Sequence, residues 1–300
     1  MKLIEAIGGT PLLELPRVAA DVPGLRLLAK AEHLNPGGSV KDRPALAMIL
    51  DGIERGPLTE GRTILEATSG NTGIADAMIG RALGYHVTLC VPGNISEERR
   101  AFLSAYGAEI VLTDPLEGTD GAIRKARALA AERPDLYFYP DQYSNPANWR
   151  AHLETTGPEI WEETGGRFTH FVAGLGTSGT FVGITRFLRA KDRSIRCISV
   201  EPDGPLHGLE GMKHMASAMV PAIYDPSLAD ARREVATEDA YAMCRRLGRE
   251  EGIFVGPSSG ANVAAALAVA HELAGAPATI VTILCDGGSR YLSAGFWKKT

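Results

Sequence analysis

Lys41 is the residue in this chain that is best suited to covalent chemistry. Residues 35–43 read Asn-Pro-Gly-Gly-Ser-Val-Lys-Asp-Arg, so Lys41 stands where a glycine-rich loop turns into a helix. The positive end of a helix dipole and partial burial both lower the pKa of a lysine amine in such a place. A less basic amine is the form that attacks an aldehyde. Since most lysines are solvated surface charges, this interpretation needs support from other loops.

A second loop, residues 68–73, reads Thr-Ser-Gly-Asn-Thr-Gly and lies between an apolar run and a helix that begins around Thr72. Backbone N–H groups at a helix amino terminus can seat a carboxylate. The Asn71 amide can also hydrogen-bond a ring hydroxyl. The same residues would equally suit a plain turn with a helix cap.

A third loop, residues 174–180, reads Gly-Leu-Gly-Thr-Ser-Gly-Thr and again joins an apolar run to a helix. Its glycines let the backbone close around an anion, and its hydroxyls add donors, which is typical of a phosphate site. It is not a P-loop, because no Gly-Lys-Ser/Thr follows, and it lacks the dinucleotide spacing.

A fourth loop, residues 256–260, reads Gly-Pro-Ser-Ser-Gly and precedes an alanine-rich helix. Ser258 suits either a helix cap or a neutral partner for a ring nitrogen. Together the four loops supply a reactive amine, two anion seats and a ring partner. They predict one ligand, pyridoxal 5'-phosphate (PLP), bound beside an amino acid carboxylate.

Short apolar runs alternate with helical periodicity along most of the chain, which predicts parallel sheets covered by helices on both faces. The expected strands are Thr63–Glu66, Val87–Val91, Glu109–Leu112, Tyr137–Tyr139, Thr169–Val172, Arg196–Val200 and Thr279–Leu284. The expected helices include 72–83, 97–106, 118–132, 146–164, 180–190, 238–250 and 260–273. Glycines 56, 84, 107 and 275 mark helix ends.

A division near Asn145 and Pro146 predicts two domains. Residues 35–145 would form a smaller mobile domain with the carboxylate loop, and 1–34 plus 146–300 a larger one with the phosphate loop. Ligands of such sheets bind at the carboxyl ends of the strands, in the crevice between the units.

The composition is that of an ordinary globular protein, with 45% apolar and 22% charged residues and a net charge of −5. No basic run indicates nucleic acid, and no apolar stretch is long enough for a membrane span. The four cysteines form no CxxC pair, and no motif predicts a metal site. We therefore expect a cytoplasmic protein without membrane or nucleic acid partners.

With these motifs the chain resembles the cysteine synthase family, the fold-type II PLP enzymes that carry out β-replacement. The resemblance extends from Ile-Gly-Gly-Thr-Pro-Leu at 7–12 to Cys-Asp-Gly-Gly at 285–288. Within the family it is strongest to the cysteine synthase B branch, through Glu-Arg-Arg at 98–100, Thr-Gly-Pro-Glu-Ile-Trp at 156–161 and Arg-Tyr-Leu-Ser at 290–293. It implies a two-lobed α/β fold like that of the tryptophan synthase β subunit.

The resemblance also implies the site residues. Lys41 would form the imine with PLP and Asn71 would contact its ring hydroxyl. Ser258 would face the ring nitrogen. The phosphate ligands would be Gly176, Thr177, Ser178, Gly179 and Thr180. The substrate carboxylate would meet Thr68, Ser69, Thr72 and Gln142. Four positions, Gly9, Gly37, Ser178 and Pro257, depart from the usual family residues, which leaves fine specificity open.

A serine at the ring nitrogen cannot hold a full positive charge there, so a substrate carbanion should be short-lived and lose its β-substituent quickly. The implied reaction is β-replacement through an α-aminoacrylate, in which sulfide, or a sulfur carrier, converts O-acetyl-L-serine to L-cysteine. O-phospho-L-serine is the alternative donor. Lys213, in the segment 203–221, would bind its phosphate unless it is simply a solvated lysine.

Other interpretations remain open at this point. One is cystathionine β-synthase-type replacement on serine, and another is a non-catalytic regulatory binding protein on the same fold, which the presence of Lys41 opposes. The family implies a homodimer, and some relatives bind the carboxyl tail of serine acetyltransferase.

Overall fold

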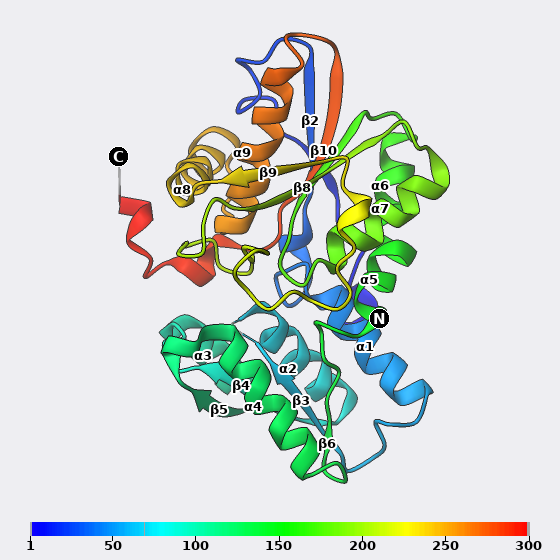
Figure 1. The fold of residues 1–300 in the computed structure, drawn as a ribbon, viewed down its shortest axis with the longest axis vertical. Helices are drawn as coiled ribbons and strands as arrows, with labels where there is room; N and C mark the ends of the chain where they lie inside the picture. Colours follow the sequence, from blue (N-terminus) through cyan, green and yellow to red (C-terminus); the bar gives the residue numbers. More distant parts are fainter. Residues whose placement is uncertain (1, 69, 299–300) are drawn as a thin grey trace.

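The computed structural model describes residues 2–68 and 70–298, and these form two lobes, each built on its own sheet (Figure 1). The sheet of the larger lobe has six strands in the order β1-β2-β10-β7-β8-β9. The sheet of the smaller lobe has four strands in the order β5-β4-β3-β6. Every neighbouring pair is parallel except β1 and β2.

In the larger lobe the central strands are apolar, as strands buried on both faces must be. The strands are β1 Leu12–Glu14, β2 Leu25–Lys30, β7 His170–Gly174, β8 Arg196–Pro202, β9 Ala231–Val235 and β10 Ala278–Ile283. Its helices are α5 Pro146–Ala151, α6 Gly157–Thr164, α7 Gly179–Lys191, α8 Thr237–Arg246 and α9 Pro257–Glu272. A π-helical turn, His152–Thr156, joins α5 to α6, so the predicted long helix over 146–164 is continuous.

The smaller lobe repeats the strand-then-helix pattern. Its strands are β3 Thr63–Ala67, β4 His86–Pro92, β5 Glu109–Thr113 and β6 Tyr137–Phe138. Its helices are α1 Asp42–Glu54, α2 Asn71–Leu83, α3 Glu97–Ala105 and α4 Gly118–Glu132. None of the helices in the described part of the chain is both long and apolar enough to cross a bilayer.

Each sheet has a separate apolar core on each face, which is why both lobes are three-layered. In the larger lobe α8 and α9 pack on one face, around Leu27 and Val172, while α6 and α7 pack on the other, around Phe171. In the smaller lobe α1 and α2 cover the face of Ile64, and α4 covers that of Leu65. The α/β prediction with helices on both faces is confirmed.

All seven predicted strands are present, within two residues of their expected ends, and the predicted capping glycines 56, 84, 107 and 275 have positive φ angles. The strands β1, β2 and β9 were not predicted from the sequence. The four-stranded sheet lies within residues 35–145, but the exact domain boundaries stay a prediction.

Candidate active site

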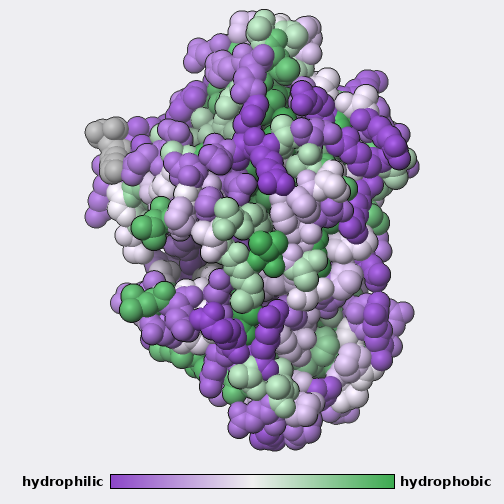
Figure 2. Space-filling view, in the orientation of Figure 1, coloured by the Kyte–Doolittle hydropathy of each residue, from purple (hydrophilic) through white to green (hydrophobic). Residues whose placement is uncertain are grey.

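A cavity of about 710 Å³ lies where the two lobes meet. Figure 2 shows the surface hollowed at this level, on the left-hand side. Its walls come from both lobes. The smaller lobe supplies Lys41, Thr68, Asn71, Thr72 and Gln142, and the larger lobe supplies Gly176, Thr177, Lys213 and Tyr291. Sites at the carboxyl ends of parallel strands are expected in this position.

Lys41 directly precedes α1 and faces the cavity. Burial is the largest influence and lowers the pKa of its amine, while the nearby Cys285 and Asp286 act in the opposite direction. Its loop is fixed from behind, because the Val40 amide donates to the Cys285 carbonyl at 2.8 Å. A lysine held in this way keeps a larger neutral fraction than a solvated lysine would, which suits attack on an aldehyde.

A buried ion network anchors the start of α1. Arg43 donates to Glu32 at 2.7 Å and to Glu159 at 2.6 Å, so it links the Lys41 helix to α6. These charges are paired on several sides, which lets them stay buried. The network therefore limits how far Lys41 can move relative to the larger lobe.

The predicted carboxylate loop forms one hydrogen-bonded set with Gln142. The Thr68 hydroxyl accepts from the amides of Gly70 at 3.0 Å and Gly73 at 3.3 Å. Thr72 donates to the Gln142 side chain at 2.7 Å, and Gln142 donates to the Ala67 carbonyl at 2.8 Å. The structure brings Thr68, Thr72 and Gln142 together, whereas Ser69 lies outside the described residues.

Asn71 is the first residue of α2 and lies across the cavity wall from the carboxyl-terminal segment. Its amide nitrogen donates to Asp286 at 2.7 Å, and its amide oxygen accepts from Arg290. These contacts orient the amide and leave one of its two N–H groups for another acceptor.

The predicted phosphate loop ends at the amino terminus of α7, a 13-residue helix that begins at Gly179. The first-turn N–H groups of a helix have no partners within it, so they favour an anion. The Thr177 hydroxyl accepts from the Asn148 amide at 3.2 Å, and the Thr180 hydroxyl contacts His152 Nε2 at the same distance. Gly176 and Thr177 line the cavity, and Ser178 lies buried behind them.

Ser258 is the second residue of α9, and Gly256 occupies the N-cap position, so Ser258 does not cap the helix. Its hydroxyl lies against the Cys285 thiol, whose pKa burial raises to about 11. Both side chains therefore offer neutral hydrogen-bonding groups, and neither offers a charge.

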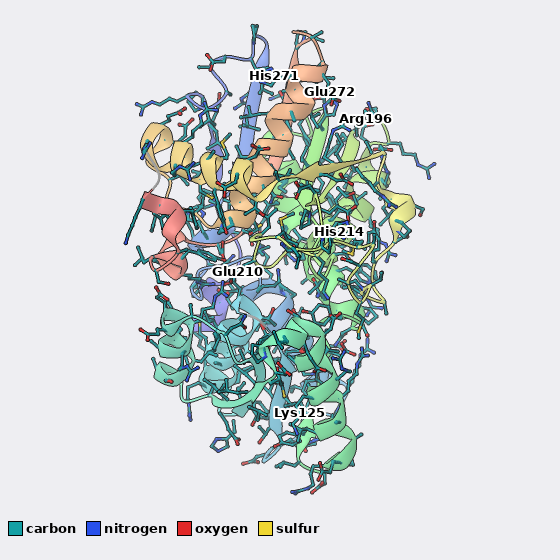
Figure 3. The ribbon with its side chains drawn as sticks, turned by 60° about the vertical axis from the view of Figure 1, so that its left-hand side comes forward. Lys125, Arg196, Glu210, His214, His271 and Glu272 are labelled. Carbon is teal, nitrogen blue, oxygen red and sulfur yellow. The ribbon has the colours of Figure 1, made fainter. Side chains whose placement is uncertain are left out.

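Lys213 lines the cavity, but its ammonium is already occupied. It forms an ion pair with Asp120 at 3.1 Å, donates to the Met219 carbonyl at 3.3 Å and lies 5.1 Å from the Tyr143 ring. Near it, Glu210 pairs with Arg99 of α3, and Figure 3 places Glu210 at the level where the lobes meet. The positive charge of Lys213 is thus balanced before any substrate arrives.

These residues fit PLP. The Lys41 amine is desolvated and faces the cavity, as an imine-forming lysine should be. At the phosphate loop, Ser178 Oγ is buried without a hydrogen-bond partner among the described residues. Buried polar atoms without partners are rare, and one explanation is a missing ligand. A hydroxyl in that place can donate to a phosphate.

Several residues with a part in the site were not predicted. Asn148 and His152 touch the phosphate loop from the helix over 146–164, and Glu66 accepts from the backbone N–H of Gln142 at 3.1 Å. Arg290 reaches Asn71 from the carboxyl-terminal segment. A polar Asn and His four residues apart on the buried face of a helix were the available signal for the first two.

Comparison with known proteins gives an extensive match. The family described as pyridoxal-phosphate dependent enzyme matches residues 3–286. A cysteine synthase of Aquifex aeolicus is 50% identical over 98% of this chain and 91% of its own. Cysteine synthase B of Escherichia coli is 44% identical over 98% of this chain and 95% of its own.

Solved structures agree with these relatives. The crystal structure of a cysteine synthase from Entamoeba histolytica superposes with a TM-score of 0.94 and 38% identity. It covers 100% of this chain, which covers 91% of it in return. The similarity therefore extends over both lobes and the cavity between them. The predicted family, fold type and cofactor are confirmed.

Proposed function

This chain belongs to the pyridoxal-phosphate dependent enzyme family, and we propose that it is a cysteine synthase that forms L-cysteine from an O-substituted L-serine and sulfide. The observation that carries this proposal is the position of Lys41. Its desolvated amine opens into a cavity that also holds a carboxylate seat and, at the amino terminus of α7, a phosphate seat. The identity to cysteine synthases over nearly the whole chain supports the same reaction.

Bound PLP supplies the electron withdrawal that makes the α-hydrogen of an amino acid acidic. The residues of the chain do the rest. Lys41 holds the cofactor and, as a neutral amine, takes the α-proton at Nζ. Thr68, Thr72 and Gln142 orient the substrate carboxylate through a set of hydrogen bonds that already exists. Ser258 gives the ring nitrogen a neutral partner.

For the donor we propose O-acetyl-L-serine. Lys213 is the cavity lysine that could bind the phosphate of O-phospho-L-serine, but Asp120 already pairs with it at 3.1 Å. A second negative charge would have to displace this carboxylate. The neutral acetyl group can bind while the ion pair of Lys213 and Asp120 stays in place. O-phospho-L-serine remains the alternative.

The test supplies the PLP-loaded protein with sulfide and either O-acetyl-L-serine, O-phospho-L-serine or serine, and measures cysteine. We expect turnover with O-acetyl-L-serine and a loss of at least roughly 10³-fold in Lys41→Ala. Absence of cysteine with all three donors would refute the proposal. Lys213→Ala should change the rate of cysteine formation by the same factor with both O-substituted donors. The control Lys125→Ala on α4 should change neither rate. A loss confined to O-phospho-L-serine would instead assign Lys213 to its phosphate.

A cystathionine-forming reaction is the second candidate. The cavity of about 710 Å³ is far larger than sulfide needs and has room for an amino acid thiol. Homocysteine in place of sulfide tests it directly. Cystathionine formed from serine faster than cysteine from O-acetyl-L-serine would make this the main activity.

We also propose a cytoplasmic homodimer that binds serine acetyltransferase. The four cysteines are unpaired in the structure, which suits a reducing compartment, and two-fold dimers are the commonest oligomers. Light scattering of the purified protein, alone and with serine acetyltransferase, measures both associations. A protein that is monomeric and does not bind serine acetyltransferase would refute this part of the proposal.

A further inference from the structure

Arg290 is a buried cation that connects two loops of the site. It lies in the short helix Gly288–Tyr291 after β10 and is 4% exposed. One guanidinium nitrogen donates to the Asn71 side-chain oxygen, and the other donates to the Gly37 carbonyl. Its planar group also lies 5.8 Å from the Phe102 ring of α3. The contacts with Asn71 and Gly37 span more than 200 residues of sequence.

Asp286 holds the other side of the Asn71 amide. Its Oδ2 atom accepts from the Asn71 nitrogen at 2.7 Å and from the Tyr291 hydroxyl at 2.6 Å. The backbone of Asp286 is itself fixed, because it pairs with Ser39 and its carbonyl accepts from Gly256 at 3.1 Å. The carboxylate therefore has little freedom to follow a moving amide.

The two contacts define which way the amide points. A guanidinium only donates, so it selects the amide oxygen, and a carboxylate accepts, so it selects the amide nitrogen. A flipped Asn71 would place oxygen against carboxylate and N–H against guanidinium. After one N–H is given to Asp286, the second N–H of the same nitrogen is left over.

We propose that Arg290 is a positioning residue for the cofactor: with Asp286 it locks the Asn71 amide so that the remaining N–H is presented to the ring hydroxyl of PLP. This inference rests on the proposed function, because it assumes that Asn71 meets that hydroxyl. Arg290 does not touch the reacting atoms and acts through Asn71.

Arg290 also sets the position of the Lys41 loop relative to Asn71. The Gly37 amide donates to Asp42 Oδ2 at 2.5 Å, while the Gly37 carbonyl accepts from Arg290. Gly37, four residues before Lys41, is therefore held at both its N–H and its carbonyl group. A single guanidinium with two parallel donors spans the two loops, which a lysine ammonium cannot match in geometry.

The test measures PLP binding to apoprotein, which is independent of catalysis. We expect Arg290→Met to raise the dissociation constant for PLP about tenfold and to shift the visible absorption of the complex. Arg290→Lys should recover only part of this loss. The matched control is Arg245→Met on α8, which removes an arginine that donates to the Phe296 carbonyl at 3.0 Å and contacts neither loop. It should leave PLP affinity unchanged.

A double-mutant cycle separates positioning from a structural role. If Arg290 acts mainly through Asn71, the absorption shift of Arg290→Met should shrink in an Asn71→Ala background to the part that its contact with Gly37 causes. An equal shift in both backgrounds would overturn the inference. An Asn71→Ala variant that binds PLP like wild type, with an unchanged spectrum, would instead contradict the role of Asn71 in the proposed function. If Arg290→Met does not fold, the same cycle is run with Arg290→Lys.

Discussion

Ser178 combines a strained backbone conformation with a buried hydroxyl that a ligand could bind. It has a φ angle of +71°, in the left-handed region that favours glycine, and its hydroxyl is buried without a partner among the described residues. Both features are unfavourable in the free protein. Both become useful if the hydroxyl donates to the phosphate of PLP, because the group is then already in place.

Ser178→Gly should therefore raise the free energy of unfolding of the apoprotein by ~1 kcal/mol, since it relieves the backbone strain and removes a buried hydroxyl. The gain should shrink when PLP is bound, because the variant loses a phosphate contact. Chemical denaturation with and without PLP measures both values. Ala274→Gly is the control, since Ala274 has a φ angle of +49° far from the loop and its gain should not depend on PLP.

Asp76 and Glu66 form a buried acidic pair beneath the carboxylate loop. Burial raises the pKa of Asp76 to about 8, and burial together with Asp76 raises the pKa of Glu66 well above its usual value. Both oxygens of Asp76 lack partners among the described residues. A carboxyl with a raised folded-state pKa gives stability that is complete below its unfolded pKa near 4 and is lost as the pH rises through 8.

Asp76→Asn should remove this dependence. Between pH 5 and 8 the free energy of unfolding of the wild type should fall relative to that of the variant. The difference should grow by up to about 1.4 kcal/mol per pH unit. Urea titrations at several pH values measure it. Asp239→Asn, at an exposed position of α8, should have the same pH dependence of stability as the wild type. The same pH dependence in Asp76→Asn would contradict the raised pKa of Asp76.

At the scale of elements, the site depends on helices that begin where strands end. The loop after β3 leads into α2, whose first residues Asn71 and Thr72 line the cavity. The loop after β7 leads into α7 and lines the cavity with Gly176 and Thr177. The helices must pack closely on the sheets to hold these termini in place. In α2 the close approach occurs at Gly80, where an added Cβ would lie 2.4 Å from Val87 of β4.

Gly80→Ala should destabilise the protein by roughly 1–3 kcal/mol, because the new methyl group forces α2 away from β4. The Asn71 end of the helix would move with it, so PLP affinity should also fall. Thermal denaturation and PLP titration measure the two effects. Gly248→Ala, where an added Cβ meets nothing within 4 Å, should be neutral or stabilising.

At the scale of the whole molecule, the cavity lies where the two lobes meet. Polar contacts join the two lobes beside the cavity: Arg99 pairs with Glu210, and Glu98 accepts from the Ser293 amide at 2.9 Å. Such contacts are weaker than an apolar interface and can break and reform. A ligand that touches both walls adds its binding free energy to this interface.

PLP should therefore stabilise the folded protein in a concentration-dependent way. At a free concentration 100 times its dissociation constant we expect about 2.7 kcal/mol, seen as a rise in Tm of several degrees. Thermal scans over a PLP series measure it. Lys41→Met should gain much less because it lacks the covalent bond, and a Tm independent of PLP in the wild type would contradict the prediction.

The sequence by itself determined the local structure: the strand-loop-helix order, the capping glycines, and the loops that carry Lys41, Asn71, the 176–180 run and Ser258. These features depend on residues close together in the chain. The missed strands broke the expected patterns for physical reasons. β2 ends in Lys30, which can be buried because Glu163 at 2.6 Å and Glu159 at 2.9 Å both pair with it. β9 is a charged edge strand with alternating exposure.

Only the tertiary structure decided how the loops meet. The contacts of Arg290 with Asn71, of His152 with Thr180 and of Asp120 with Lys213 join side chains from 28 to 219 residues apart in the sequence. No periodicity or turn signal encodes such pairs, because they arise when separate helices and strands pack against one another. The direction of the Asn71 amide and the neutralised charge of Lys213 followed from that packing.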